Sequence, residues 1–352
     1  MDTSITTLNS KRIEYLDFAK GLCMIAIILG HLGEPGINRI VYTFHLPVFF
    51  IISGYFFDPN KSFGETVSKK LRSLIWPYYF AGFLIVLFSV VSNAIFLHAD
   101  IGTIKDDILY WSVATVFGVG TTVSDSLLFM PPIGMTWFLW ATFWGYILLW
   151  WLMKLPVIPR VILISAVFVL ASITVGKGWF LPLSIQPGCS AVLYMYIGFL
   201  WKKNKDRLIA LPMTIKVLLI VFSLTAWALF IISFVSFWLV GCVYGHGLRD
   251  VIGSICASAM ILGISYFVVK YAEKHTVFIR FIGKYSIIAM TAQLIELNTL
   301  QLDNQVLGFF EGRISYIGAL LILILIKSCW MYLFTWMFSR FRITRKLFGL
   351  KY

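Results

Sequence analysis

Long apolar segments recur along the whole chain and set the strongest limit on its fold. Most are about as long as the 17–25 residues that a helix needs to cross the hydrocarbon core of a bilayer. Hydrophobic residues make up 60% of the 352 residues and charged residues 13%, against roughly half and a quarter in soluble domains. The sequence therefore predicts an all-α, polytopic membrane protein and argues against a soluble helical domain.

We predict about ten transmembrane helices. The first and sixth are short, and residues 106–119 are apolar enough for an interfacial or re-entrant helix that would change the count. The predicted spans are residues 15–32, 38–57, 74–97, 133–153, 157–175, 188–201, 212–235, 249–269, 280–300 and 314–338.

The positive charges alternate between the two sides of these spans. Lys11 and Arg12 precede the first span, and most of the 29 lysine and arginine residues fall on their side. Because such residues collect on the cytoplasmic side of membrane proteins, we predict an N-in and C-in topology. The net charge of +13 then reflects contact with anionic membrane lipids, and no nucleic-acid partner is expected. The opposite side carries Arg39, Lys105, Lys177, Arg249 and Arg313.

The predicted spans follow one another without a long hydrophilic insertion. Residues 1–352 are therefore expected to form a single transmembrane domain with no soluble accessory domain. Residues 1–14 are polar and lack a small-residue cleavage site, so we interpret the first span as retained. The five cysteines are scattered and the histidines fit no familiar ligand spacing, so no metal is expected.

Three ionisable residues share one face of the first predicted span, in YLDFAKGLCMIAIILGH. Around an ideal helix, Lys20 and His31 differ by about 20° and Asp17 and His31 by about 40°. Ionisable residues are costly inside a membrane and are functional candidates by default. The alternative is an Asp17–Lys20 ion pair at one helix end and an interfacial histidine at the other.

A second histidine, His45, lies near the start of the apolar segment FHLPVFFIISGYFF. An apolar setting favours neutral histidine, which is the form that a general base needs. Glu34-Pro35-Gly36 predicts a turn between the first two spans. His31 and His45 should therefore lie at neighbouring helix ends. We predict that they face a polar tunnel, and a structural hydrogen bond to His45 is the alternative.

Other candidate residues occur further along the chain. In KKLRSLIWPYYF, Lys69, Lys70 and Arg72 carry charges suited to phosphate groups, although ordinary anchoring on the cytoplasmic side explains them equally well. Most of the tryptophans in TWFLWATFWGYILLWW suggest packing or an interfacial belt, and Trp137 is the one that we expect to line a cavity.

Together these segments resemble the acyltransferase-3 family of integral membrane O-acyltransferases, in the fucose 4-O-acetylase-like and polysaccharide O-acetylating branch. The resemblance is carried by the basic residue and histidine at Lys20 and His31, by FHLPVFFIISGYFF, and by KKLRSLIWPYY. WFL at 137–139 and FIGKYSIIAMTAQL at 281–294 match more weakly. Three features depart from the family pattern. Lys20 replaces a frequent arginine, Gln293 replaces a frequent histidine, and WFLWAT lacks the common acidic residue.

The resemblance implies acyl transfer from cytoplasmic acetyl-CoA to a hydroxyl of a sugar in a cell-envelope glycan or its lipid-linked precursor. It implies a multi-pass protein of the bacterial cytoplasmic (inner) membrane, with His31 as general base. Direct transfer and an acetyl-histidine intermediate both stay open, as does the oligomeric state. The implied site residues are His31, His45 and Asp17 for catalysis, Lys20, Lys69, Lys70, Arg72 and Tyr78 for CoA, and Glu34, Trp137, Gln293 and Glu296 for the acceptor.

Two other classes of protein fit part of the pattern. A transporter or flippase of a glycan or small solute also suits many spans with intramembrane charges. Carriers often contain inverted repeats with matching broken helices, whereas His31, His45 and the basic motifs here fall in the first 80 residues. A sensor that binds an acyl donor without turnover is a third interpretation.

Overall fold

The computed structural model describes residues 13–96, 98–122 and 129–350, which are mostly helical. Lys11 and Arg12 lie outside this part. A two-stranded antiparallel sheet pairs β1 (Phe237–Trp238) with β2 (Val243–Tyr244). The helices are α1 (Glu14–Gly30), α2 (Pro35–Val41), α3 (His45–Tyr55), α4 (Phe63–Lys70), η1 (Leu71–Ile75), α5 (Trp76–Val91), η2 (Ser92–Phe96), α6 (Ile101–Phe117), η3 (Gly134–Thr136), α7 (Trp137–Leu152), α8 (Val157–Gly176), α9 (Ile185–Ala210), α10 (Met213–Ile232), η4 (Leu239–Gly241), α11 (Leu248–Ala272), η5 (Glu273–Thr276), α12 (Val277–Lys284), α13 (Ser286–Ile295), η6 (Glu296–Leu300), α14 (Leu302–Phe310), α15 (Tyr316–Arg340) and α16 (Arg342–Leu347).

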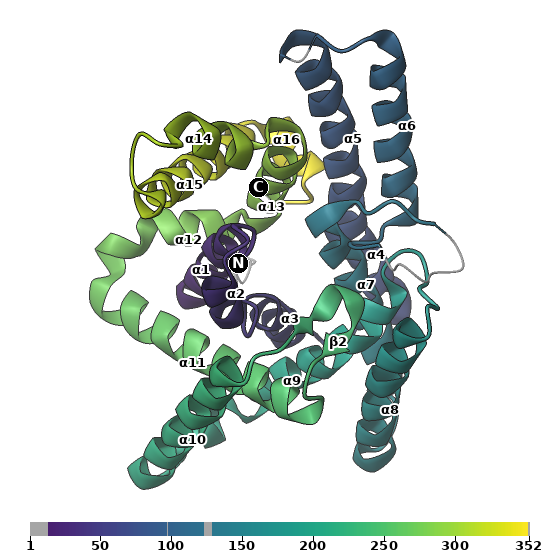
Figure 1. The fold of residues 1–352 in the computed structure, drawn as a ribbon. Coiled ribbons are helices and arrows are strands. Elements are labelled where there is room, and N and C mark those ends of the chain that lie inside the picture. The colour runs from purple at the N-terminus through teal and green to yellow at the C-terminus, as the bar shows by residue number, and fades with distance from the viewer. Residues whose placement is uncertain (1–12, 97, 123–128, 351–352) are drawn as a thin grey trace, which may run out of the picture.

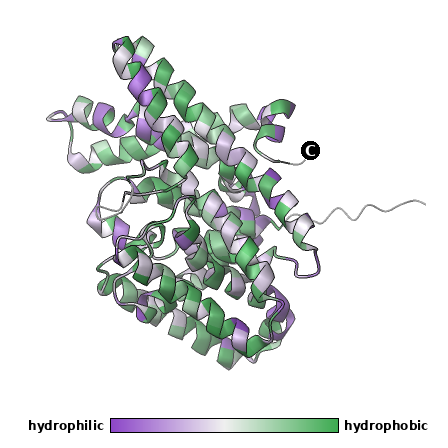
Figure 2. Cartoon of the chain, turned by 90° about the vertical axis from the view of Figure 1, so that its right-hand side faces the viewer, coloured by the Kyte–Doolittle hydropathy of each residue, from purple (hydrophilic) through white to green (hydrophobic). Residues whose placement is uncertain are grey.

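Every predicted span contains a helix in the structure, which confirms an all-α protein with several membrane-spanning helices. Hydrophobic residues extend along much of the long helices, and hydrophilic residues occur at several helix ends and in loops (Figure 2). Within the described residues, six helical segments are long and apolar enough to cross a membrane. The count of ten and the orientation stay predictions. The six segments are Pro35–Tyr55, Phe63–Ile95, Val157–Gly176, Met213–Ile232, Leu248–Lys284 and Tyr316–Arg340.

Helix α1 lies near the centre of the molecule, between α3, α11 and α12 (Figure 1). Its backbone comes close to that of α12 through two glycines. A Cβ atom on Gly21 would lie 2.0 Å from the carbonyl oxygen of Ile279, and one on Gly283 would lie 1.7 Å from that of Asp17. The small residues therefore fix the position of the helix that ends at His31.

Helix α3 crosses α9 at a second close contact. A Cβ atom on Gly54 would lie 1.8 Å from the Met195 carbonyl oxygen, and one on Gly198 would lie 1.9 Å from the Ile51 carbonyl oxygen. Small residues permit such close helix crossings in membrane proteins. This crossing fixes α3, which begins at His45.

Residues 106–119, which are apolar enough for an interfacial or re-entrant helix, fall largely within α6, which runs beside α5 (Figure 1). Polar contacts join the two helices. Asp107 accepts hydrogen bonds from Ser89 at 2.8 Å and Asn93 at 2.6 Å. Near the other end of α6, the Tyr78 hydroxyl donates to the Thr115 carbonyl at 2.7 Å. Helix α6 is thus attached to α5 along most of its length.

Candidate active site

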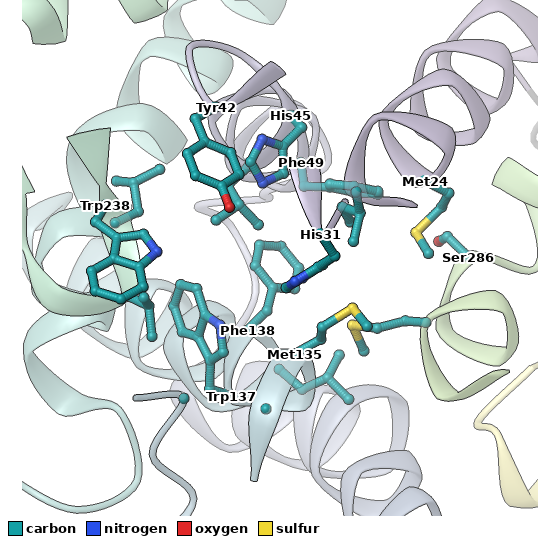
Figure 3. A pocket seen from close by; sticks show the side chains of 18 of the residues that line it. Met24, His31, Tyr42, His45, Phe49, Met135, Trp137, Phe138, Trp238 and Ser286 are labelled. Carbon is teal, nitrogen blue, oxygen red and sulfur yellow. The ribbon is translucent and has the colours of Figure 1, made fainter. Parts of the chain in front are cut away.

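A cavity of about 180 Å³ lies between the end of α1, the start of α3, the start of α7 and the segment around β1 and η4. We call it the histidine cavity. Cavities of about 150 Å³ hold a benzene-sized group, so this space suits an acyl group and its neighbouring atoms rather than a whole glycan. Figure 3 shows the lining side chains, which include His31, Tyr42, His45, Phe49, Trp137, Phe138, Trp238 and Ser286.

The first turn of α3 constrains His45. Its Nδ1 lies 2.7 Å from the carbonyl oxygen of Val41, across the break between α2 and α3. A carbonyl only accepts hydrogen bonds, so Nδ1 carries the proton and Nε2 of the neutral ring is left as an acceptor. The ring also lies against Tyr42, with centroids 5.4 Å apart. The hydrogen bond that the sequence suggested as an alternative is therefore present, and the same side chain lines the cavity.

The second histidine of the cavity, His31, caps the carboxyl end of α1. Its side chain is exposed toward the cavity (Figure 3). The Tyr42 hydroxyl donates to the Gly30 carbonyl at 2.9 Å and so ties this helix end to α2. Within the described part of the chain, the His31 ring makes no hydrogen bond. Both of its nitrogens are consequently available to a ligand.

Two other candidates on α1 lie away from this cavity. The Asp17 carboxylate and the Lys20 ammonium are 2.8 Å apart, which is the ion pair that the sequence suggested as an alternative. Asp17 is buried and Lys20 is partly exposed. Neither lines the histidine cavity, and both precede His31 by several helical turns.

The basic residues just before the third predicted span point in different directions. The Lys70 ammonium lies 3.4 Å from the centre of the Tyr146 ring of α7. Arg72 instead lines a groove beside α16, and Lys69 is exposed. Tyr78 is fully buried against α6 and lines neither space.

The predicted acceptor-binding residues are distributed around the cavity. Trp137 lines it. Gln293 is buried behind it and donates to the carbonyl oxygen of Met24, a lining residue, at 3.0 Å. Glu34 lies outside the lining and accepts a hydrogen bond from Tyr316 at 2.5 Å.

Glu296 belongs to a buried ionic cluster that the sequence did not reveal. Its carboxylate lies 3.3 Å from the ammonium of Lys327, which also donates to Asp303. Glu296 is 2% exposed and Lys327 is 1% exposed. Lys327 is a charged residue inside the last apolar segment, which marks it as a functional candidate. No spacing pattern in the sequence indicates that residues 296, 303 and 327 lie together. The sequence also gave no signal for Tyr42, Trp238 or Ser286 as lining residues.

Comparisons with known proteins identify the family of this chain. A family model named Acyl_transf_3, described as an acyltransferase domain, matches residues 13–333. Nodulation protein NolL of Mesorhizobium japonicum is 29% identical over an alignment of 150 residues, and the match covers 38% of this chain and 34% of that protein. The matched region thus spans about a third of that relative's length. No solved structure matches the chain. Since the family model covers most of the sequence, the chain belongs to the Acyl_transf_3 family of acyltransferases.

Proposed function

We propose that this membrane acyltransferase moves an acetyl group from cytoplasmic acetyl-CoA to a hydroxyl of an extracytoplasmic sugar in a cell-envelope glycan. We further propose that it does so in the bacterial cytoplasmic membrane. The observation that carries the proposal is the pair of histidines that face one small, largely apolar cavity in a chain of an acyltransferase family. The volume suits the thioester carbonyl and the attacking hydroxyl.

In the proposed mechanism, His31 is the general base. It takes the proton from the sugar hydroxyl while the oxygen attacks the thioester carbonyl. The bond between carbon and sulfur then breaks, and the proton passes to the leaving thiolate to give free CoA and an O-acetyl sugar. General-base catalysis of this kind contributes about 10²–10⁴-fold in rate.

We assign His45 to orienting His31. Its Nδ1 is engaged by the Val41 carbonyl, so the neutral ring has no N–H left to donate to an oxyanion. We propose that its Nε2 accepts the N–H of the His31 ring once substrate is bound, which leaves the other nitrogen of His31 as the base. This arrangement fixes a tautomer in the way that partner groups do for other catalytic histidines.

The donor and acceptor contacts belong to the same proposal. Lys20, Lys69 and Lys70 supply charges for the CoA phosphates, whereas Arg72, which the resemblance also implies for CoA, lines a separate groove. Trp137 contacts the acceptor within the cavity. Five other candidates do not line the histidine cavity, so we propose that they act through neighbouring groups. They are Asp17, Tyr78, Glu34, Gln293 and Glu296.

The test uses membranes that carry either the wild type or the His31→Ala variant at matched expression and are supplied with acetyl-CoA labelled in the acetyl group. We expect label in the glycan fraction with the wild type and a loss of about 100-fold or more with the variant. Trp151→Phe, at an exposed position outside the cavity, is the control and should retain activity. Equal labelling by His31→Ala and wild type would remove the assignment of His31 as the base.

A further inference from the structure

A groove of about 1020 Å³ lies between η1, the start of α5 and the C-terminal helix α16. We call it the basic groove. Its lining includes three cationic side chains, Arg72, Arg342 and Lys346, together with the aromatic rings of Trp76 and Tyr79. It shares no lining residue with the histidine cavity.

The cations come from two distant parts of the sequence. Arg72 belongs to η1, whereas Arg342 and Lys346 are four residues apart and lie on one face of α16. Among the residues that the structure describes, no carboxylate lines the groove. Arginine and lysine side chains that converge in this way bind phosphate groups by charge-assisted hydrogen bonds.

Buried contacts hold α16 in place against α5. Phe348, just after α16, is fully buried, and its ring centroid is 5.0 Å from that of Phe80. A Cβ atom on Gly349 would lie 2.5 Å from the carbonyl oxygen of Arg72. Helices α16 and α5, which form the two walls, are therefore fixed to each other, so the shape of the groove is set by the folded structure.

An apolar stripe continues from the groove along α5. Trp76, Tyr79, Phe83 and Leu87 follow helical spacing, so they share one face of the helix. All four are exposed, with Trp76 57% and Phe83 58% accessible. They lie within Phe63–Ile95, which is long and apolar enough to span a membrane. A ligand in the groove would thus have both a phosphate site and an adjoining surface for a hydrocarbon chain.

We propose that the basic groove binds a phosphate-bearing membrane lipid. The headgroup phosphate contacts Arg72, Arg342 and Lys346, and an acyl or prenyl chain lies along the stripe from Trp76 to Leu87. The stripe favours a lipid over a free nucleotide, because a water-soluble phosphate has no apolar chain to cover these exposed side chains.

The experiment titrates phosphatidylglycerol into the purified full-length chain in neutral detergent and counts bound lipid by native mass spectrometry. We expect one phosphatidylglycerol to bind at least tenfold more tightly than phosphatidylcholine. Each cation near an anionic headgroup contributes roughly fivefold. The triple variant Arg72→Gln, Arg342→Gln, Lys346→Gln should therefore bind phosphatidylglycerol at least tenfold more weakly.

The matched control is Lys203→Gln, Lys205→Gln, Arg207→Gln, which removes three exposed charges from α9. It should change phosphatidylglycerol affinity less than twofold. If the groove variant fails to fold, Lys346→Gln alone changes one exposed side chain and should weaken binding roughly fivefold.

Two results would overturn the proposal. One is equal loss of phosphatidylglycerol binding in the groove and control variants, which would mean that only net charge matters. The other is unchanged phosphatidylglycerol binding with at least tenfold weaker CoA binding in the groove variant. That result would assign the groove to the acyl donor.

Discussion

At the scale of single residues, the two histidines of the cavity differ in how firmly they are held. His45 is bonded to the Val41 carbonyl in the first turn of its helix, and this bond selects one tautomer. His31 stands at a helix end with its ring exposed to the cavity. A fixed acceptor beside a less constrained ring is the arrangement expected when one histidine orients the other.

The role of His45 can be separated from its structural bond. Asparagine places an N–H donor near the position of Nδ1 but has nothing at the position of Nε2. We expect His45→Asn to keep the bond to Val41, to fold normally, and to lose about tenfold or more in kcat because His31 is no longer oriented. The measurements are steady-state turnover of acetyl-CoA and the thermal unfolding midpoint.

Glutamine provides the complementary control at this position, since its amide reaches toward the position of Nε2 and lacks the donor near Val41. His45→Gln should unfold at lower temperature than His45→Asn while retaining more activity. Full turnover by His45→Asn would show that Nε2 has no part in the reaction and that His45 is only a structural residue.

At the scale of helices, the site depends on how closely α3 approaches α9. Gly54→Ala places a methyl group against the Met195 carbonyl, so the helices must separate. Overpacking of this kind costs about 1–3 kcal/mol. We expect a lower unfolding midpoint, and also lower activity because α3 positions His45. Both are measured on protein purified in the same detergent.

The control for this prediction is Gly263→Ala in α11, where an added Cβ would meet no atom within 4 Å. Alanine favours a helix over glycine by about 1 kcal/mol, so this variant should be as stable as the wild type or slightly more stable. If Gly54→Ala and Gly263→Ala had the same unfolding midpoint, the close contact between α3 and α9 would not contribute to the stability of the fold.

The sequence predicted where helices occur better than how they pair. Apolar segments mark helices because backbone polar groups inside a bilayer must be hydrogen-bonded within the segment. Every predicted span contains a helix. Hydropathy carries no information on the Asp107 contacts that attach α6 to α5, nor on Asp303 as a partner of Lys327. The histidines of the site were predictable because an ionisable residue in an apolar segment is costly. The other lining residues are ordinary aromatic and small side chains and gave no such signal.

At the scale of the whole molecule, the number of membrane crossings depends in part on the stretch from α11 to η6. Residues 249–269 and 280–300 are predicted as separate spans, whereas the structure has a continuous helical stretch from Leu248 to Lys284. A straight helix of these 37 residues would be about 55 Å long, well beyond a hydrocarbon core of about 30 Å. In Figure 1, α11 and α12 instead follow an arc around α1. The chain therefore has room to turn back across the membrane after η5.

Cysteine labelling tests this topology with Lys205→Cys, Lys274→Cys and Glu311→Cys, all at exposed positions. Cys189 and Cys329, which are not fully buried, are first replaced by serine. An N-in chain with ten spans places residues 205 and 274 in the cytoplasm and residue 311 on the opposite side. A membrane-impermeant maleimide should then label only the Glu311→Cys variant in intact cells, and the other two only in inverted vesicles. If the Lys274→Cys and Glu311→Cys variants react from the same side, residues 280–300 do not cross the membrane, and the prediction of ten spans is wrong at that segment.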